Sequence, residues 1–399
     1  YFMCGTTYYH LLLNARAHDR WQEAIDGAVR YGMNKARFSL YPSPAKGGVG
    51  RYPLSTPFAD EGLMHPDLDH WRAADKVVRY MAQRGFLADV ILFWTKPKGS
   101  ETLLREDERY LRYALARLAA FPNVIWCMVN EWNYSGVPQD YWNRLGGLVR
   151  EEDSWSRDGD FVRVLSIHQQ TRPDWNFAGQ TWPSHAILQF GVRNRGPSVR
   201  VGDEWANAGP GSRRFRHGDE WGNHSIVRNW TGTYPVVNDE FGYIGEPQDV
   251  SADKLPDGGF QRFTRVKHRH TMWAIAAGGG YGATGDKNDY DDGRPYFSAN
   301  WHDTPEYGDV RHLVTFFSKG DLQYWKMAPH NELVKSGTRV YVLAEPGRQY
   351  VVYAAVGGSL AFDLAPGRYA ARRLDPRTGT TTALPEVAGG AVCALDAPD

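Results

Sequence analysis

The feature that most constrains the fold is an alternation, from residue 1 to about residue 320, of short apolar runs with segments whose apolar residues recur at helical spacing. A strand, a helix and another strand in succession are typical of a parallel sheet with helices on its faces. The stretch is long enough for an eightfold β/α barrel with insertions. We therefore predict a (β/α)8 TIM barrel over residues 1–325.

Residues 124–130 are the clearest buried strand, because the run from Val124 to Val129 is apolar throughout. The Gly-rich residues 278–285 are expected to hold the eighth strand, and residues 191–221 a long loop over the active face. The other strands are expected at residues 2–8, 35–40, 87–94, 162–168, 186–190 and 235–239. The helices are expected at residues 19–31, 69–84, 106–121, 263–277 and 305–317.

The pattern changes after residue 330, where apolar residues alternate with polar ones and turn residues recur every eight to twelve positions. This pattern predicts a small antiparallel β-sandwich over residues 330–399. So short a β domain has little core of its own, so we expect it to serve as an accessory that packs on the barrel.

Charge and hydropathy exclude several kinds of partner. The chain has 46 Lys and Arg against 46 Asp and Glu, which is not the charge balance of a nucleic-acid-binding protein. No apolar run approaches the length that spans a bilayer. The three cysteines have no metal-type spacing. Because the chain begins at Tyr1 without a signal-peptide pattern, we expect that a leader or an upstream domain has been removed.

Two acidic residues stand directly after apolar strands. Glu131 follows Asn130 at the end of the fourth strand, and Glu240 follows the seventh strand. The carboxyl ends of barrel strands form the face that carries the active site, and strands four and seven lie on opposite sides of its mouth. Two facing carboxylates are the machinery of glycoside hydrolysis. Alternatively, each Glu caps a helix or pairs with an arginine, and only the combination favours catalysis.

The segments that carry these residues resemble a known group of enzymes. The Asn-Glu pair and the lone Glu are similar to those of clan A retaining glycoside hydrolases. The wider sequence resembles their bacterial apiosidase-like branch, formerly of unknown function, in which the barrel is often followed by a β domain named for collagen binding. The segments in question are YFMCGTTYY at residue 1, NKARFSLYP at 34, RYLRYALARLAAFPNVIWCMVNEW at 109, SIHQQ at 166 and PVVNDEFGY at 235.

The resemblance implies a role for each residue of the motifs. Glu131 would be the general acid/base and Glu240 the nucleophile, with retention of the anomeric configuration and carboxyl groups about 5 to 5.5 Å apart. Asn130 would hold the sugar hydroxyl beside the anomeric carbon. Arg37, at the end of strand two, would keep Glu240 ionised by its positive charge, whereas a surface ion pair is the plainer alternative.

Further residues at strand ends are expected to face the substrate. His168 and Gln189 end strands five and six, and each is a candidate for a sugar-hydroxyl contact. Trp94, Trp132 and Trp182 are candidates for stacking on a sugar ring, with core packing the equal alternative. Tyr8 and Tyr243 are candidates for donating to the nucleophile or to a hydroxyl. The chain has Thr284-Gly285-Asp286 where relatives have His-Gly-Glu. Asp286 also begins an acidic loop, which we expect to face substrate or solvent rather than to bind calcium.

The sequence thus predicts a retaining glycoside hydrolase that uses no cofactor or metal. Its substrate would be a plant or bacterial glycan or glycoside, and apiose-type or other furanosyl targets are implied by the resemblance alone. One rival is a non-catalytic carbohydrate-binding protein on a barrel scaffold, and another is a collagen-binding adhesin. Secretion or a periplasmic location is favoured over the cytoplasm, and the motifs disfavour zinc hydrolases, lipases and nucleotide enzymes.

Overall fold

The computed structural model describes residues 2–17, 20–41, 56–60, 64–93, 104–153, 155, 162–170, 174–189, 218–244, 265–286, 305–318 and 321–398. The chain divides into two compact units. The N-terminal unit contains Gly5–Gln189 and Ala283–Asp303. The C-terminal unit contains Tyr1–Cys4, Phe190–Gly282 and Thr304–Asp399.

Parallel strands are the framework of the N-terminal unit. Five of them follow the order β5-β4-β3-β2-β1, and β6 pairs with β7. Their bounds are β1 Cys4–Thr7, β2 Lys35–Ser39, β3 Leu87–Phe93, β4 Val124–Val129, β5 Leu165–Ser166, β6 His168–Gln170 and β7 Ala186–Gln189. The predicted strand over 162–168 is thus two short strands that break at Ile167.

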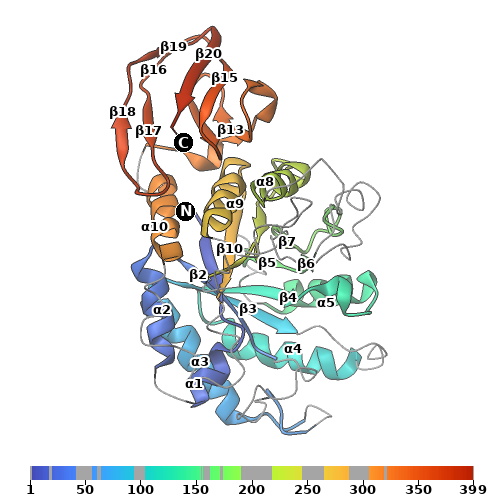
Figure 1. The fold of residues 1–399 in the computed structure, drawn as a ribbon. Helices are drawn as coiled ribbons and strands as arrows, with labels where there is room; N and C mark the ends of the chain where they lie inside the picture. Colours follow the sequence, from blue (N-terminus) through green and yellow to red (C-terminus); the bar gives the residue numbers. More distant parts are fainter. Residues whose placement is uncertain are drawn as a thin grey trace, which may run out of the picture. The chain divides into compact units, whose positions relative to one another are not determined.

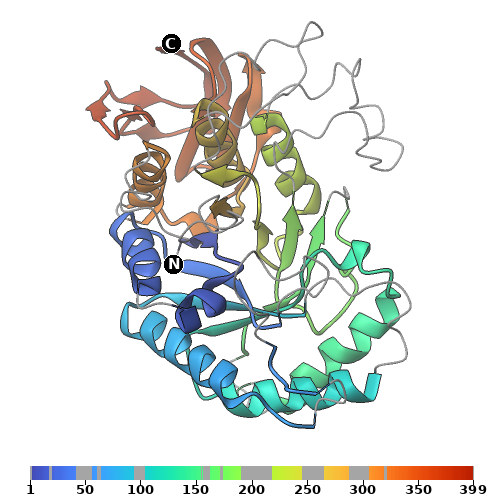
Figure 2. The same cartoon turned by 60° about the horizontal axis from the view of Figure 1, so that its bottom comes forward.

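Helices alternate with these strands and lie outside them (Figures 1 and 2). Asp67 caps the helix between β2 and β3 by accepting from the backbone N–H groups of Asp69 and His70. That helix ends before Gly85, whose φ of 66° is the left-handed geometry that glycine tolerates. The helices are α1 Leu11–Ala17, α2 Trp21–Arg30, α3 Leu68–Gln83, α4 Leu104–Leu118 and α5 Gln139–Glu152, with the 3-10 turn η3 at Trp132–Tyr134.

A buried ion pair lies between strands β2 and β3. Lys35 Nζ is 2.7 Å from Asp89 Oδ2, and both side chains are almost completely shielded from solvent. Gly5 on β1 pairs in register with Lys35, and a Cβ at Gly5 would lie 2.8 Å from the Lys35 carbonyl oxygen. Strand β1 therefore needs glycine at this position, because a larger residue would push it away from the lysine.

The C-terminal unit begins with a helical and parallel part. Strands β8 and β10 pair in parallel, with Tyr281 beside Val237 and Gly282 beside Asn238. The division between the units crosses β10 after Gly282. The elements are α8 Gly218–Asn229, β8 Val236–Asn238, β9 Tyr243–Ile244, α9 Arg265–Ala277, β10 Tyr281–Asp286 and α10 Pro305–Ser318.

Short antiparallel strands complete this unit, as predicted. Leu360, Phe362, Leu364 and Cys393 lie on two paired strands and form a hydrophobic cluster on one face of their sheet. The elements are η7 Tyr324–Lys326, β11 Ala328–Pro329, η8 Asn331–Leu333, β12 Val334–Ser336, β13 Val340–Glu345, β14 Gln349–Ala354, β15 Gly358–Leu364, β16 Arg368–Tyr369, β17 Arg372–Leu374, β18 Thr381–Ala383, β19 Val387–Ala388 and β20 Ala391–Ala397.

A buried carboxylate joins these sheets to helix α8. Asp219 is fully buried and accepts from both Arg339 and Tyr341, with Arg339 Nε 2.8 Å and Tyr341 Oη 2.7 Å away. Burial, followed by the charge of Asp219, raises the pKa of Tyr341, so its hydroxyl stays protonated and donates. The predicted domain boundary at residues 325–330 stays a prediction, since the sheets and the helices α8 to α10 belong to one compact unit.

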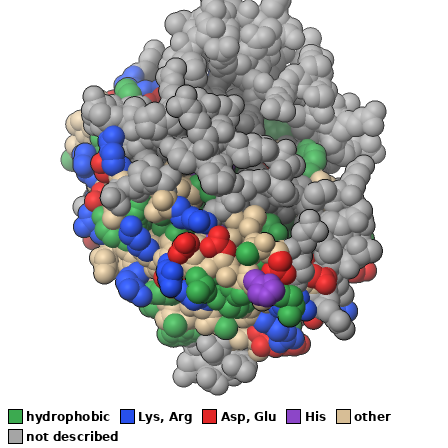
Figure 3. All heavy atoms as spheres, turned by 90° about the horizontal axis from the view of Figure 1, so that it is seen from below, with side chains coloured by type: hydrophobic (Ala, Val, Ile, Leu, Met, Phe, Trp, Pro, Cys, Tyr) green, Lys and Arg blue, Asp and Glu red, His purple; other side chains and the backbone are tan. Residues whose placement is uncertain are grey.

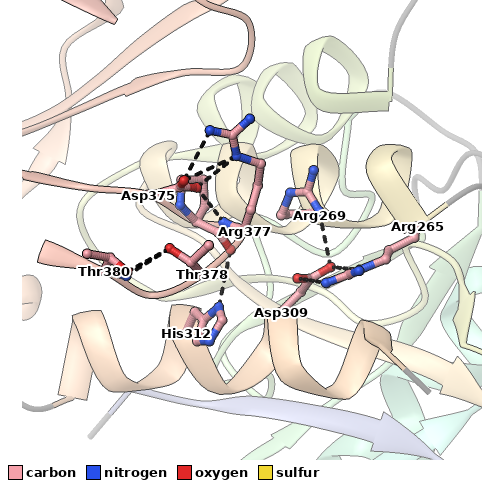
Figure 4. Close-up of polar contacts among 9 residues, drawn as sticks. Arg265, Arg269, Asp309, His312, Asp375, Arg377, Thr378 and Thr380 are labelled. Atoms are coloured by element: carbon pink, nitrogen blue, oxygen red, sulfur yellow. Dashed lines mark hydrogen bonds and ion pairs between the residues drawn. The ribbon is translucent and has the colours of Figure 1, made fainter. Parts of the chain in front are cut away.

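A second junction joins helix α10 to the turn between β17 and β18 (Figure 4). His312 Nδ1 donates to the carbonyl of Pro376 at 3.3 Å. On the same helix, Asp309 accepts two hydrogen bonds from Arg265 at 2.8 Å and pairs with Arg269 at 3.4 Å.

The described part of one face of the molecule carries mixed charge. On the part of the face that Figure 3 colours, basic and acidic side chains lie among one another rather than in patches of one sign. In the part of the chain that the structure describes, no helix combines the length and the apolar character needed to cross a membrane.

Candidate active site

The turn that carries Asn130 and Glu131 follows directly from strand β4. Every residue of that strand is buried, and the Asn130 N–H continues the ladder by donating to the Phe93 carbonyl at 3.1 Å. Glu131 then adopts a left-handed backbone with φ 52° and ψ 57°. Its side chain is half-buried. A buried strand thus presents a carboxylate to solvent at its carboxyl end, as the sequence predicts.

A buried polar cluster surrounds the Asn130 side chain. Arg37 Nη2 donates to Asn130 Oδ1 at 3.1 Å, and His168 Nδ1 lies 2.8 Å from the same oxygen. Arg37 Nη2 also lies 3.1 Å from His168 Nδ1, so the three side chains meet at one point, and the role of this ring nitrogen depends on the tautomer of His168. Arg37 and His168 are both inaccessible to solvent. Three sequence-predicted residues from strands β2, β4 and β6 therefore meet around one amide group.

A fourth member of this cluster, Tyr9, was not predicted. Its hydroxyl donates to Asn130 Oδ1 at 3.4 Å, and its ring lies 6.0 Å from the Arg37 guanidinium carbon. The predicted Tyr8 instead donates to the Ala24 carbonyl on helix α2, at 3.3 Å. Both tyrosines follow strand β1, and Tyr9 lies in a turn, so no regular alternation in the sequence distinguishes them.

Glu240 lies in the C-terminal unit, in the turn that follows β8, and only 3% of its surface is exposed. The next residue, Phe241, packs over Gly282, where a Cβ would come within 3.2 Å of the ring. On its other side Phe241 contacts His268 of helix α9, with ring centroids 5.0 Å apart. Burial, with a smaller contribution from Arg269, lowers the pKa of His268 to about 3, so this wall of the turn is uncharged at neutral pH.

The two predicted catalytic carboxylates thus stand in different compact units, Glu131 in the N-terminal and Glu240 in the C-terminal one. Each occupies the strand-end turn that the sequence predicts for it. Their separation, and the effect of the Arg37 charge on Glu240, stay predictions.

Gln189 ends strand β7 beside Gln170 of β6. It is 4% exposed, and its side-chain oxygen accepts no hydrogen bond from the described residues. A buried amide oxygen without a donor costs free energy. A substrate hydroxyl would supply that donor, and the role of Gln189 in substrate binding stays a prediction.

The predicted stacking residues Trp132 and Trp182 are both buried and pack edge-to-face on Phe177, at 5.2 and 5.5 Å. Trp182 also donates to Asn143. These contacts favour the core-packing alternative for both rings. Trp94 and the side chains of Tyr243 and Asp286 lie outside the described residues, although the backbone of Asp286 ends strand β10.

Metal ligation finds no support in the described ranges, where no three His, Cys, Asp or Glu side chains gather closely enough to hold an ion. The part of the acidic loop beyond Asp286 lies outside those ranges. The cysteines Cys4, Cys127 and Cys393 are buried, and none of them forms a disulfide.

Comparison with known proteins finds a matching family. A family model described as "Apiosidase-like, catalytic domain" matches residues 1–323. No curated protein matches the chain.

Solved structures share the fold at low sequence identity. A glycoside hydrolase family 5 protein from Bacteroides vulgatus ATCC 8482 superposes over 100% of this chain and 87% of its own, with a TM-score of 0.73 and 15% identity. A second protein, described as a glycoside hydrolase, covers 100% of this chain and 89% of its own at TM-score 0.72 and 14% identity. An endo-1,4-beta-D-mannanase from Thermotoga petrophila RKU-1 covers 79% of this chain and all of its own at TM-score 0.53 and 12% identity. These likenesses confirm the predicted (β/α)8 barrel.

Proposed function

The chain belongs to the apiosidase-like family, and from that premise we propose that it is a retaining glycoside hydrolase in which Glu131 and Glu240 are the catalytic carboxylates. The observation that carries the proposal is the Asn130-Glu131 turn. It stands at the end of a fully buried parallel strand, and Arg37 and His168 hold its asparagine.

In the proposed reaction the Glu240 carboxylate attacks the anomeric carbon while the Glu131 carboxyl group gives its proton to the departing glycosidic oxygen. The bond from that oxygen to the anomeric carbon breaks, and a glycosyl ester of Glu240 forms. Glu131, now a carboxylate, takes a proton from water, whose oxygen attacks the same carbon and releases Glu240. No metal or redox cofactor enters these steps.

The polar cluster would orient the substrate in this scheme. Asn130 Oδ1 already accepts from Arg37 and Tyr9, so any hydrogen bond that the amide donates to a sugar comes from Nδ2. Hydrogen bonds to the hydroxyl beside the anomeric carbon strengthen as the oxocarbenium-like transition state develops. Gln189 would accept from another hydroxyl.

We propose as substrate a plant or bacterial glycan or glycoside, with apiose-type and other furanosyl residues tested first because of the family. The identity of the sugar, and whether cleavage is at chain ends or internal, is decided by product analysis on a broad panel of glycans and aryl glycosides. Extracellular or periplasmic action is the location we propose, and fractionation of the native cells tests it.

Substitution of the two carboxylates tests the mechanism. We expect Glu131→Ala and Glu240→Ala each to lower turnover by at least about a hundredfold, since acid–base and nucleophilic groups each contribute on that order or more. Azide should rescue one of the two variants and yield a glycosyl azide. Glu108→Ala, on helix α4 where Glu108 pairs with Arg144 at 2.9 Å, serves as the control and should keep its activity. Activity like the wild type in either catalytic variant would disprove the proposal.

A further inference from the structure

The backbone conformation of Glu131 is imposed by neighbouring residues, because it is one that a glutamate does not favour. Among the described residues other than glycine, only Glu131 and Arg339 have positive φ. The left-handed region costs an L-residue about 1 to 2 kcal/mol, so it persists only where the surroundings impose it.

Strand β6 supplies the surroundings through three consecutive residues. His168 contacts Asn130 at 2.8 Å. The next residue along the strand, Gln169, accepts from the Trp132 indole N–H at 3.2 Å. Each contact thus falls on a residue beside Glu131, one before it and one after it.

The third contact is made by Gln170 and consists of two hydrogen bonds. Asn133 Nδ2 donates to the Gln170 carbonyl at 2.9 Å, and the Gln170 N–H donates to Asn133 Oδ1 at 2.9 Å. The asparagine side chain thereby pairs with the backbone of the strand as a neighbouring strand would. Two bonds in opposite directions fix the position and the rotation of η3.

Strand β6 is itself held by hydrogen bonds to the residues that follow it in the chain. Gln169 Nε2 donates to the Asp174 carbonyl at 2.6 Å, and its oxygen also accepts from the Asn176 N–H at 3.0 Å. Ser135 closes η3 by donating to the Trp132 carbonyl at 2.6 Å. The turn at Glu131 therefore lies between two anchored segments.

We propose that Asn133 is a positioning residue for Glu131, and that its paired hydrogen bonds with Gln170 hold the carboxyl group where it can protonate a leaving group. The inference rests on the proposed role of Glu131 as general acid, but its structural part can be tested separately. It gives residues 168–170 a function beyond that of His168 in the polar cluster.

The structural test compares crystal structures of Asn133→Ala and Gln139→Ala. Gln139 is the matched control, because it also links the two segments, donating to the Asn176 carbonyl at 2.8 Å, but it lies outside the turn. We expect Glu131 to leave the left-handed region in Asn133→Ala alone. An unchanged φ at Glu131 in that variant would overturn the inference whatever the enzyme's activity.

The kinetic test uses leaving groups. The 2,4-dinitrophenolate group of a dinitrophenyl glycoside leaves without being protonated, whereas the phenolate group of a phenyl glycoside of the same sugar needs a proton from the general acid. For Asn133→Ala we expect kcat/KM to fall about tenfold or more with the phenyl substrate and less than about threefold with the dinitrophenyl substrate. Equal losses on both substrates would show a merely structural role, without bearing on Glu131 itself.

Trp132→Phe gives a second route if Asn133→Ala does not fold. It removes only the indole hydrogen bond to Gln169 and keeps a ring against Phe177. We expect the same selective loss with the phenyl substrate, though smaller. A loss independent of the leaving group would again contradict the inference. In contrast, full activity of Glu131→Ala would remove the proposed function and leave the crystallographic result standing.

Discussion

The left-handed backbone of Glu131 predicts a conflict between stability and activity at a single residue. Glycine enters this region without the steric cost that a Cβ imposes. A residue kept in an unfavourable conformation at a strand end, with a cluster of buried polar groups beside it, is typical of a functional site.

We expect the free energy of unfolding of Glu131→Gly to be higher than that of Glu131→Ala by about 1 kcal/mol. Both variants lose the carboxylate, but only alanine keeps a Cβ in the left-handed region. Both variants should be inactive. Urea unfolding at neutral pH measures the difference.

The control for this comparison is Glu108 in helix α4, where the order should reverse and glycine should be the less stable by about 1 kcal/mol. Equal stabilities of Glu131→Gly and Glu131→Ala would show that the turn carries no strain.

The residues of the candidate site differ in how far the sequence could identify them. Asn130 and His168 stand at the ends of predicted strands, and the structure places both in one cluster. Tyr9 and Asn133 could not be singled out, because their roles depend on hydrogen bonds to distant segments rather than on a local pattern.

At the scale of elements, helix α8 shows why part of the C-terminal unit escaped prediction. Residues 191–221 were expected to be a loop, yet α8 starts at Gly218. Its buried side includes Asp219, Asn223 and Asn229, so the apolar periodicity that reveals most amphipathic helices is weak. Partners far along the chain satisfy these groups, such as Asn331, which donates to Asn223 at 2.7 Å.

The junction between α8 and β13 should contribute strongly to stability. Asp219→Ala leaves Arg339 and Tyr341 with buried donors and no carboxylate. Breaking a buried pair in this way costs about 3 to 5 kcal/mol. Urea unfolding of the full chain measures the loss.

The comparison variant is Glu386→Ala, which breaks the exposed pair with Arg368 and should cost at most about 1 kcal/mol. Similar small losses in both variants would mean that the Asp219 junction is not a determinant of stability.

For the whole molecule, two buried histidines predict sensitivity to acid. Burial lowers the pKa of His70 to about 4 and that of His268 to about 3, against about 6.5 when unfolded. Below about pH 6.5 the unfolded chain binds protons that the folded chain does not, so the free energy of unfolding falls as pH falls. Each histidine contributes a slope of about 1.4 kcal/mol per pH unit until its folded pKa is reached.

Urea unfolding between pH 7.5 and 5 tests this dependence. The free energy of unfolding of the wild type should fall as the pH is lowered over this range. For His268→Phe the slope should be smaller by about 1.4 kcal/mol per pH unit, which corresponds to one proton. An identical slope in the variant would show that His268 is protonated in the folded state.

Removal of residues 326–399 tests whether residues 1–325 fold without the C-terminal sheets. The truncated chain lacks Arg339 and Tyr341, which pair with Asp219, and Pro376, which accepts from His312. We therefore expect loss of cooperative thermal unfolding, measured by circular dichroism against the full chain. A well-folded 1–325 fragment would instead support an independent second domain, as the adhesin alternative requires.

The match between residues 168–170 and the residues around Glu131 limits how this enzyme can be recombined with its relatives. A chimaera that replaces only the segment after β4 removes the Asn133 side chain that pairs with the Gln170 backbone, and one that replaces only β6 removes the Gln169 side chain that accepts from Trp132. Loop grafting aimed at new specificity should therefore exchange residues 130–139 and 168–176 as one cassette.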